Sequence, residues 1–287
     1  MPEATQATIQ GGAGELFVRA WLPAAAPRAI IAICHGFNAH SGMYAWSGDQ
    51  FAQHGMTAYA LDLRWRGESD GERFYVESFD DYVDDLSRLI DYAQSREPDL
   101  PVFLLGHSAG GVNACLYALE HQDKLAGLIC EDFAFETPAP DFALAVLKGL
   151  SHLAPHAGAL ALKNEDFSRD AKVVEAMNND PLIAHETQPF ATMAAIVRAD
   201  DRLKRSFGQI TLPLLIIHGA ADKAAKPSGS VHFHERAGSR DKTLKLYEGR
   251  YHDPLNDLGK DEVRPISWPG STPASRRPRP RPEARRE

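Results

Sequence analysis

Short continuous apolar runs alternate along most of the chain with longer segments that carry apolar residues on one face only. The runs have the length of buried strands and lie at 28–34, 56–63, 101–105, 125–130 and 212–219, and a last strand is predicted at 243–247. The segment 78–95 repeats apolar residues with helical spacing: Phe79, Tyr82, Val83, Leu86, Ile90 and Ala93. Strands alternating with helices predict an α/β domain with a mostly parallel sheet. Segments 15–22 and 28–34 are predicted to pair at its edge.

The alternation stops between residues 136 and 207, where helices are predicted at 141–153 and 188–206. We expect this segment to be a helical cap, inserted into a core formed by residues 1–135 and 208–264. Apolar side chains on its underside are candidates for an acyl pocket, namely Phe142, Leu147, Leu150, Phe190 and Met193. The alternative is that these residues only pack against the sheet.

The segment 265–287 differs from the rest of the chain because proline and arginine dominate it. Such a composition buries too little apolar surface to order itself, so we expect a disordered tail.

Composition narrows the class of protein. The chain has 287 residues, 44% of them apolar, which is enough for one α/β domain with a large core. Its net charge of −8 argues against nucleic acid as a partner. The first residues are too polar for a signal peptide, and no run is long enough for an integral membrane segment. Three cysteines in apolar contexts, Cys34, Cys115 and Cys130, suggest free thiols, and therefore a cytoplasmic location. The oligomeric state stays open.

The most informative motif is Gly-His-Ser-Ala-Gly at 106–110, which follows the apolar run 101–105 and precedes a helix-compatible segment. A strand, a sharp turn and a helix are the context in which G-x-S-x-G forms a nucleophile elbow. Such a turn exposes the serine hydroxyl at the end of a buried strand, so Ser108 is the candidate nucleophile.

A serine hydroxyl needs a base, and the base needs an acid that orients it. Asp222 and His252 each follow a predicted strand, in the chain order Ser, Asp, His that is typical of α/β-hydrolases. Asp132, after the run 125–130, is the alternative acid. Asp253 adjoins the base and is expected to point elsewhere.

Other histidines fit the role of base less well. His107 lies inside the elbow, where its side chain should face away from the serine hydroxyl. His232 and His234 form an H-x-H pair without a third ligand at metal-site spacing, so we predict no metal site.

Acyl transfer also needs donors for the negative charge that develops on the carbonyl oxygen. One backbone N–H should come from Ala109, the residue after the nucleophile, and a second from the loop after the early strand 28–34. We expect Phe37 to supply the second donor.

Taken together and in order, the blocks 35–42, 66–71, 106–111, 218–222 and 247–252 resemble the monoacylglycerol lipase and lysophospholipase branch of the α/β-hydrolases, also described as serine aminopeptidase S33-like. The resemblance covers about residues 14–260. It implies an eight-stranded, mostly parallel sheet flanked by helices, an inserted helical cap, and ester hydrolysis without a cofactor. One departure is Arg64-Trp65-Arg66, where family members often have a second glycine or a histidine before Gly67.

The sequence therefore predicts a serine carboxylester hydrolase whose substrates are monoacylglycerols, lysophospholipids or similar short- to medium-chain esters. Two alternatives stay open. The same three residues could cleave an amide, a thioester or a carbon–carbon bond, or the fold could serve as a non-catalytic binding protein.

Overall fold

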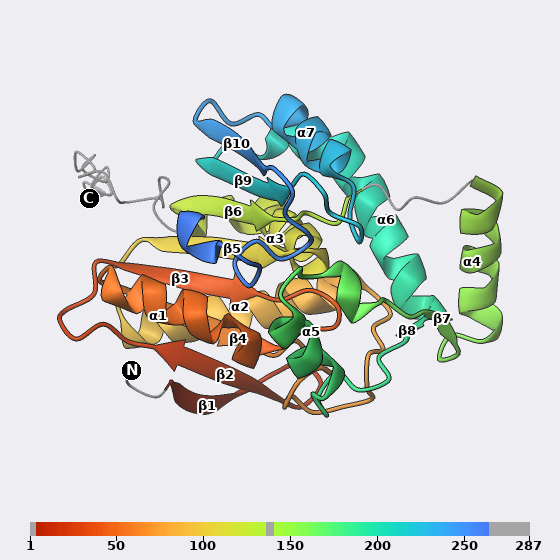
Figure 1. The fold of residues 1–287 in the computed structure, drawn as a ribbon, viewed down its shortest axis with the longest axis horizontal. Helices are drawn as coiled ribbons and strands as arrows, with labels where there is room; N and C mark the ends of the chain where they lie inside the picture. The colour runs from red at the N-terminus through yellow and green to blue at the C-terminus, as the bar shows by residue number, and fades with distance from the viewer. Residues whose placement is uncertain (1–3, 136–140, 264–287) are drawn as a thin grey trace, which may run out of the picture.

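The computed structural model describes residues 4–135 and 141–263, without the side chains of 141–146. The predicted disorder of 265–287 lies outside the described residues, as does the side chain of Phe142. Eight strands form one sheet in the order β1-β2-β4-β3-β5-β6-β9-β10 (Figure 1). Their bounds are β1 Thr5–Gln10, β2 Glu15–Trp21, β3 Ala29–Cys34, β4 Met56–Leu61, β5 Val102–His107, β6 Gly127–Glu131, β9 Leu214–Gly219 and β10 Lys242–Tyr247.

Most of this sheet is parallel, as the sequence predicts. The pairs β1–β2 and β2–β4 are antiparallel, and the pairs from β4–β3 through β9–β10 are parallel. The predicted edge pair of β2 and β3 is wrong, because β4 lies between them. The sequence of β3 explains this position, because all of its side chains are apolar. A strand of this kind is buried on both faces and lies inside the sheet, and every residue of β3 is buried. The edge is β1, which sequence analysis missed because its residues are largely polar and exposed.

Alternate residues of β3 face two apolar clusters. Ile30 and Ala32 pack with side chains of α2 (Phe79–Arg96), α3 (Ala109–His121) and α7 (Pro227–Arg236), whereas Ile31 and Ile33 pack with Phe51 of α1 (Ala45–Gln53). Helices therefore cover both faces (Figure 1). Short 3-10 helices complete the connections: η1 Ser41–Tyr44, η2 Gln122–Lys124, η3 Asn164–Asp166, η4 Phe207–Gln209 and η5 Lys260–Glu262.

The chain between β6 and β9 is an insertion in the alternation. It contains the two predicted helices as α4 (Asp141–Leu153) and α6 (Phe190–Ser206). It also contains α5 (Ala171–Asn178) and the small antiparallel pair β7 (Gly158–Leu160) and β8 (Gln188–Pro189), which sequence analysis did not predict. In Figure 1, α4 lies on the outer side of α6, away from the sheet.

Two further observations concern the cysteines and the hydropathy of the helices. Cys34, Cys115 and Cys130 are all buried and free. In the part of the chain that the structure describes, no helix has both the length and the hydropathy needed to cross a bilayer.

Candidate active site

Ser108 ends β5 and precedes α3 in the sharp turn that the motif predicts. Its backbone angles, φ 56° and ψ −123°, are strained for a residue with a side chain. The turn is tight because Gly110 has no side chain: a Cβ there would lie 2.3 Å from the carbonyl oxygen of Cys34. The Ser108 N–H donates to the Glu131 carbonyl at 2.9 Å, which ties the turn to β6. The sheet thus holds the serine hydroxyl at the carboxyl edge of its central strands.

His252 lies in the loop after β10 and contacts Ser108 directly. Its Nε2 lies 2.7 Å from the Ser108 Oγ, and its Nδ1 lies 2.7 Å from the Asp222 Oδ2. The imidazole is buried, and the ring of Phe167 from the insertion packs edge-on against it with centroids 4.9 Å apart. A hydroxyl, an imidazole and a carboxylate in this series are the arrangement that activates a serine.

Asp222 is held by donors on every side. Its Oδ1 accepts the backbone N–H groups of Ala224 and Ala225 at 2.7 and 3.0 Å. Its Oδ2 lies 3.0 Å from the Nε2 of His218 as well as beside His252. Burial alone would raise the pKa of Asp222, but the nearby His252 and the hydrogen bonds from His218 and His252 outweigh burial and hold the pKa well below its usual value. The carboxylate is therefore charged at neutral pH.

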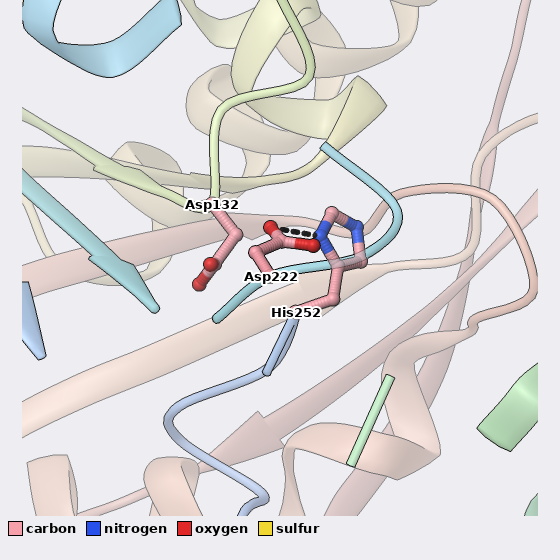
Figure 2. Close-up of side chains that lie close together, drawn as sticks. All are labelled: Asp132, Asp222 and His252. Carbon is pink, nitrogen blue, oxygen red and sulfur yellow. Dashed lines mark hydrogen bonds and ion pairs between the residues drawn. The ribbon is translucent and has the colours of Figure 1, made fainter. Parts of the chain in front are cut away.

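Asp132, the alternative acid, lies on the other side of Asp222 (Figure 2). In that figure Asp222 reaches the imidazole of His252 and Asp132 does not. Burial raises the pKa of Asp132 well above its usual value, and the neighbouring Asp222 and Glu131 raise it further. The surroundings therefore favour the protonated form of Asp132 and the ionised form of Asp222. It accepts the Gly219 N–H at 2.9 Å, which fixes the end of β9.

Asp132, Asp222 and His252 also form the group within the described residues whose ligand atoms lie close enough together to hold a metal ion, all within 4.8 Å. An ion there would have to displace the contact between Asp222 and the His252 Nδ1 and to deprotonate Asp132. Both requirements disfavour a metal at this position.

The predicted oxyanion donors, Phe37 and Ala109, line the same cavity as Ser108. Among the described residues, neither N–H has a hydrogen-bond acceptor, which leaves both free for a substrate oxygen. Gly36 brings the two loops together, because a Cβ there would lie 2.8 Å from the Ser108 Cβ. His35 braces the loop through Nδ1 to the Gly36 carbonyl at 2.7 Å, while its Nε2 accepts the Leu63 N–H. Burial lowers the pKa of His35 to about 4, so this brace is neutral.

The cavity above Ser108 holds about 100 Å³ and is largely apolar. Phe135 borders it from the loop after β6, and Lys226 borders it just before α7. The insertion supplies Leu160, Leu162, Met193 and Ile196.

Of the four expected cap residues whose side chains the structure describes, Met193 alone lines this cavity. Leu147 and Leu150 are absent from its lining because α4 packs on α6 rather than over Ser108. Phe190, the first residue of α6, does not line the cavity either. The lining residues of that helix are Met193 and Ile196, which lie further along it. The hydrophobic periodicity located the helices but not the side of each that meets the site. Leu160 ends the three-residue strand β7 and Leu162 follows it, and so short an element gives no periodic signal in the sequence.

The histidines set aside in the sequence take other places. His107 points away from the hydroxyl, with its Nε2 2.9 Å from the His252 carbonyl oxygen. His232 and His234 lie on α7. Asp253 accepts from Asn256 and not from the imidazole.

Comparison with known proteins identifies the family of the chain. The family model described as serine aminopeptidase, S33, matches residues 25–259. The chain belongs to this family. It is 34% identical to the monoglyceride lipase of Rattus norvegicus over 240 residues, covering 83% of this chain and 79% of that protein. It is 31% identical to the monoacylglycerol lipase of Mycolicibacterium smegmatis, covering 86% of this chain and 90% of that one.

A solved structure shows the same fold. The monoacylglycerol lipase of Paleococcus ferrophilus superposes with a TM-score of 0.78 at 26% identity, over 87% of this chain and 95% of that one. The predicted family and the α/β-hydrolase fold are thereby confirmed, and the chain is a serine hydrolase by family.

Proposed function

We propose that this serine hydrolase cleaves carboxylic esters through Ser108, His252 and Asp222, with monoacylglycerols, lysophospholipids or similar short- to medium-chain esters as substrates. One observation carries the proposal: the hydroxyl, imidazole and charged carboxylate form a continuous hydrogen-bonded series that opens into an apolar cavity. The names of the relatives agree with it, since those quoted above are monoglyceride or monoacylglycerol lipases.

The geometry gives each side chain a step. The Ser108 Oγ attacks the ester carbonyl while the His252 Nε2 takes its proton and then gives it to the leaving alcohol. Asp222 holds the imidazole in the tautomer that leaves Nε2 free, and its charge stabilises the imidazolium. Water then enters the cavity and repeats the cycle on the acyl-enzyme.

The backbone N–H groups of Phe37 and Ala109 donate hydrogen bonds to the negatively charged oxygen of the tetrahedral intermediate. Removal of one such donor in serine hydrolases lowers kcat by about 100- to 1000-fold, so the rate depends strongly on the orientation of these N–H groups.

Residues 136–207 act, in this proposal, as a cap on a core formed by 1–135 and 208–264. The cap decides which acyl chains fit, because Leu160, Leu162, Met193 and Ile196 supply most of the large apolar side chains of the cavity. The buried free thiols support a reducing compartment such as the cytoplasm.

The test is a hydrolysis panel with monoacylglycerols of graded chain length, lysophospholipids, p-nitrophenyl esters and matched amides and thioesters. We expect glycerides and simple esters to be turned over fastest. Faster turnover of an amide or a thioester would mean that the same three residues cleave that bond instead. A fluorophosphonate probe should label Ser108, and absence of both labelling and turnover would favour a binding protein.

A further inference from the structure

The loop that carries Phe37 runs from β3 to η1 without regular secondary structure of its own. Asn38 has a φ of 49°, in the left-handed region that costs energy for residues other than glycine. A loop with this strain keeps its shape only where its surroundings hold it.

The surroundings that hold it belong to the insertion. The Asn38 N–H donates to the Glu186 Oε1 at 2.9 Å, and the Asn38 amide donates to the Asn164 Oδ1 at 2.9 Å. His40 contacts Asp180 at 2.8 Å. All three partners follow the loop by more than 120 residues in sequence. The shape of the oxyanion loop is therefore fixed partly by a segment outside the sheet.

Glu186 is itself fixed by a buried arginine. Its Oε1 pairs with the guanidinium of Arg66 and accepts the Gln188 side-chain amide at 2.6 Å. Arg66 also donates to the Tyr82 hydroxyl at 3.1 Å and to the Gln188 Oε1 at 2.7 Å. Both charged side chains are only 1% exposed. A carboxylate held in this way presents its oxygen to Asn38 in one position.

Arg66 reaches the oxyanion loop a second time. Its guanidinium carbon lies 4.6 Å from the centre of the Phe37 ring. The pair thus holds the side chain of Phe37 on one side and the peptide that follows Phe37 on the other. With both fixed, the Phe37 N–H has little freedom to turn away from the cavity.

We propose that Glu186 and Arg66 are positioning residues for the oxyanion hole, so that the hole is complete only while the insertion is seated on the loop 35–41. The proposal rests on the proposed function, since it assigns a role in the same acyl transfer. Neither Glu186 nor Arg66 lines the cavity itself, and the pair reaches the site through Phe37 and Asn38 of the oxyanion loop. Its loss should therefore affect transition-state stabilisation more than substrate affinity.

Arg64 provides a matched control, because it lies with Arg66 in the loop between β4 and α2. It also is buried and pairs with a carboxylate, that of Asp85, whose side chain is fully buried. The ion pair of Arg64 and Asp85 joins the β4–α2 loop to α2. Among the described residues, neither side chain hydrogen-bonds to residues 35–41. Within the described residues, removal of Glu186 leaves Arg66 without a carboxylate partner, whereas removal of Asp85 leaves Arg64 paired with Asp81 and Asp84. Both removals cost stability, but only the removal of Glu186 releases Asn38.

The experiment compares Glu186→Ala, Glu186→Gln and Asp85→Ala with the wild type, using p-nitrophenyl acetate well below each variant's melting temperature. We expect Glu186→Ala to lower kcat by about 30- to 300-fold with KM changed less than about threefold, because a misplaced donor loses most of its effect. Glu186→Gln should recover only part of the lost kcat, since its amide oxygen can still accept the Asn38 N–H but carries no charge to pair with Arg66. Asp85→Ala should melt earlier yet keep kcat within about threefold.

The proposal is overturned if folded Glu186→Ala keeps its kcat, or if Asp85→Ala loses as much. Should Glu186→Ala fail to fold, Glu186→Gln decides: a kcat lowered at constant KM supports the proposal, and an unchanged kcat overturns it. Failure of the proposed function would look different, because the wild type itself would then neither hydrolyse the ester nor take up a fluorophosphonate.

Discussion

The turn that carries Ser108 and the insertion between β6 and β9 meet at one cavity, but they are built differently. The turn joins a fully buried strand to a buried helix. The insertion is irregular and more exposed, and the small sheet within it is only β7 and β8. This contrast suggests a division of labour: the core fixes the reacting groups, and the insertion selects the acyl chain and steadies the oxyanion loop. Changes in the core should therefore abolish activity, and changes in the insertion should retune it.

The largest effect should come from the core, at the nucleophile. Ser108→Ala should lower kcat on a p-nitrophenyl ester by about three to six orders of magnitude, because covalent catalysis is lost while the oxyanion donors remain. Steady-state kinetics and a melting curve measure activity and folding separately. A folded Ser108→Ala protein with substantial activity would mean that another residue is the nucleophile.

The next largest effect separates the two buried carboxyls. Asp222→Asn should lower kcat by about 100- to 10,000-fold, because an amide cannot stabilise the imidazolium or fix its tautomer. Asp132→Asn should keep kcat within about tenfold, since Asp132 does not reach His252 and burial raises its pKa, which favours a neutral side chain. The opposite ranking of the two kcat values would assign the acid to Asp132.

A smaller, graded effect is expected in the insertion. Met193→Ala enlarges the cavity, so the ester chain length with the highest kcat/KM should increase. The preference of the variant for longer chains should rise by up to about fourfold in kcat/KM for each added methylene. Leu147→Ala, on α4 and outside the cavity lining, is the matched control. If a series of ester chain lengths gives the same profile for Met193→Ala, Ile196→Ala and wild type, the insertion does not form the acyl pocket.

The smallest effect concerns stability and pH. The folded chain holds the Asp132 proton more tightly than the unfolded chain does, because the pKa of this carboxyl is raised on folding. Its contribution to stability is complete below the unfolded pKa of about 4 and falls as pH rises from there toward the folded pKa. In urea titrations between pH 5 and 9, Asp132→Asn should therefore lose stability less steeply with rising pH than wild type. Parallel curves for the two proteins would mean that Asp132 is not titrating in this way.

The sequence alone determined the central strands, the serine turn and the chain order of Ser108, Asp222 and His252. It could do so because buried strands and G-x-S-x-G turns are local patterns, and parallel strands bring their carboxyl ends to one edge. The two main helices of the insertion were predictable for the same reason, from the spacing of their apolar residues.

The tertiary structure decided what depends on partners distant in the chain. It put β4 between β2 and β3, turned α4 away from the cavity, and placed Leu160 and Leu162 over the serine. It also brought Glu186 to Arg66 across 120 residues of sequence. The departure at Arg66 gave only a sign that this loop is unusual. Its partner could not be predicted, because a buried charge reveals the carboxylate that neutralises it only after the chain has folded.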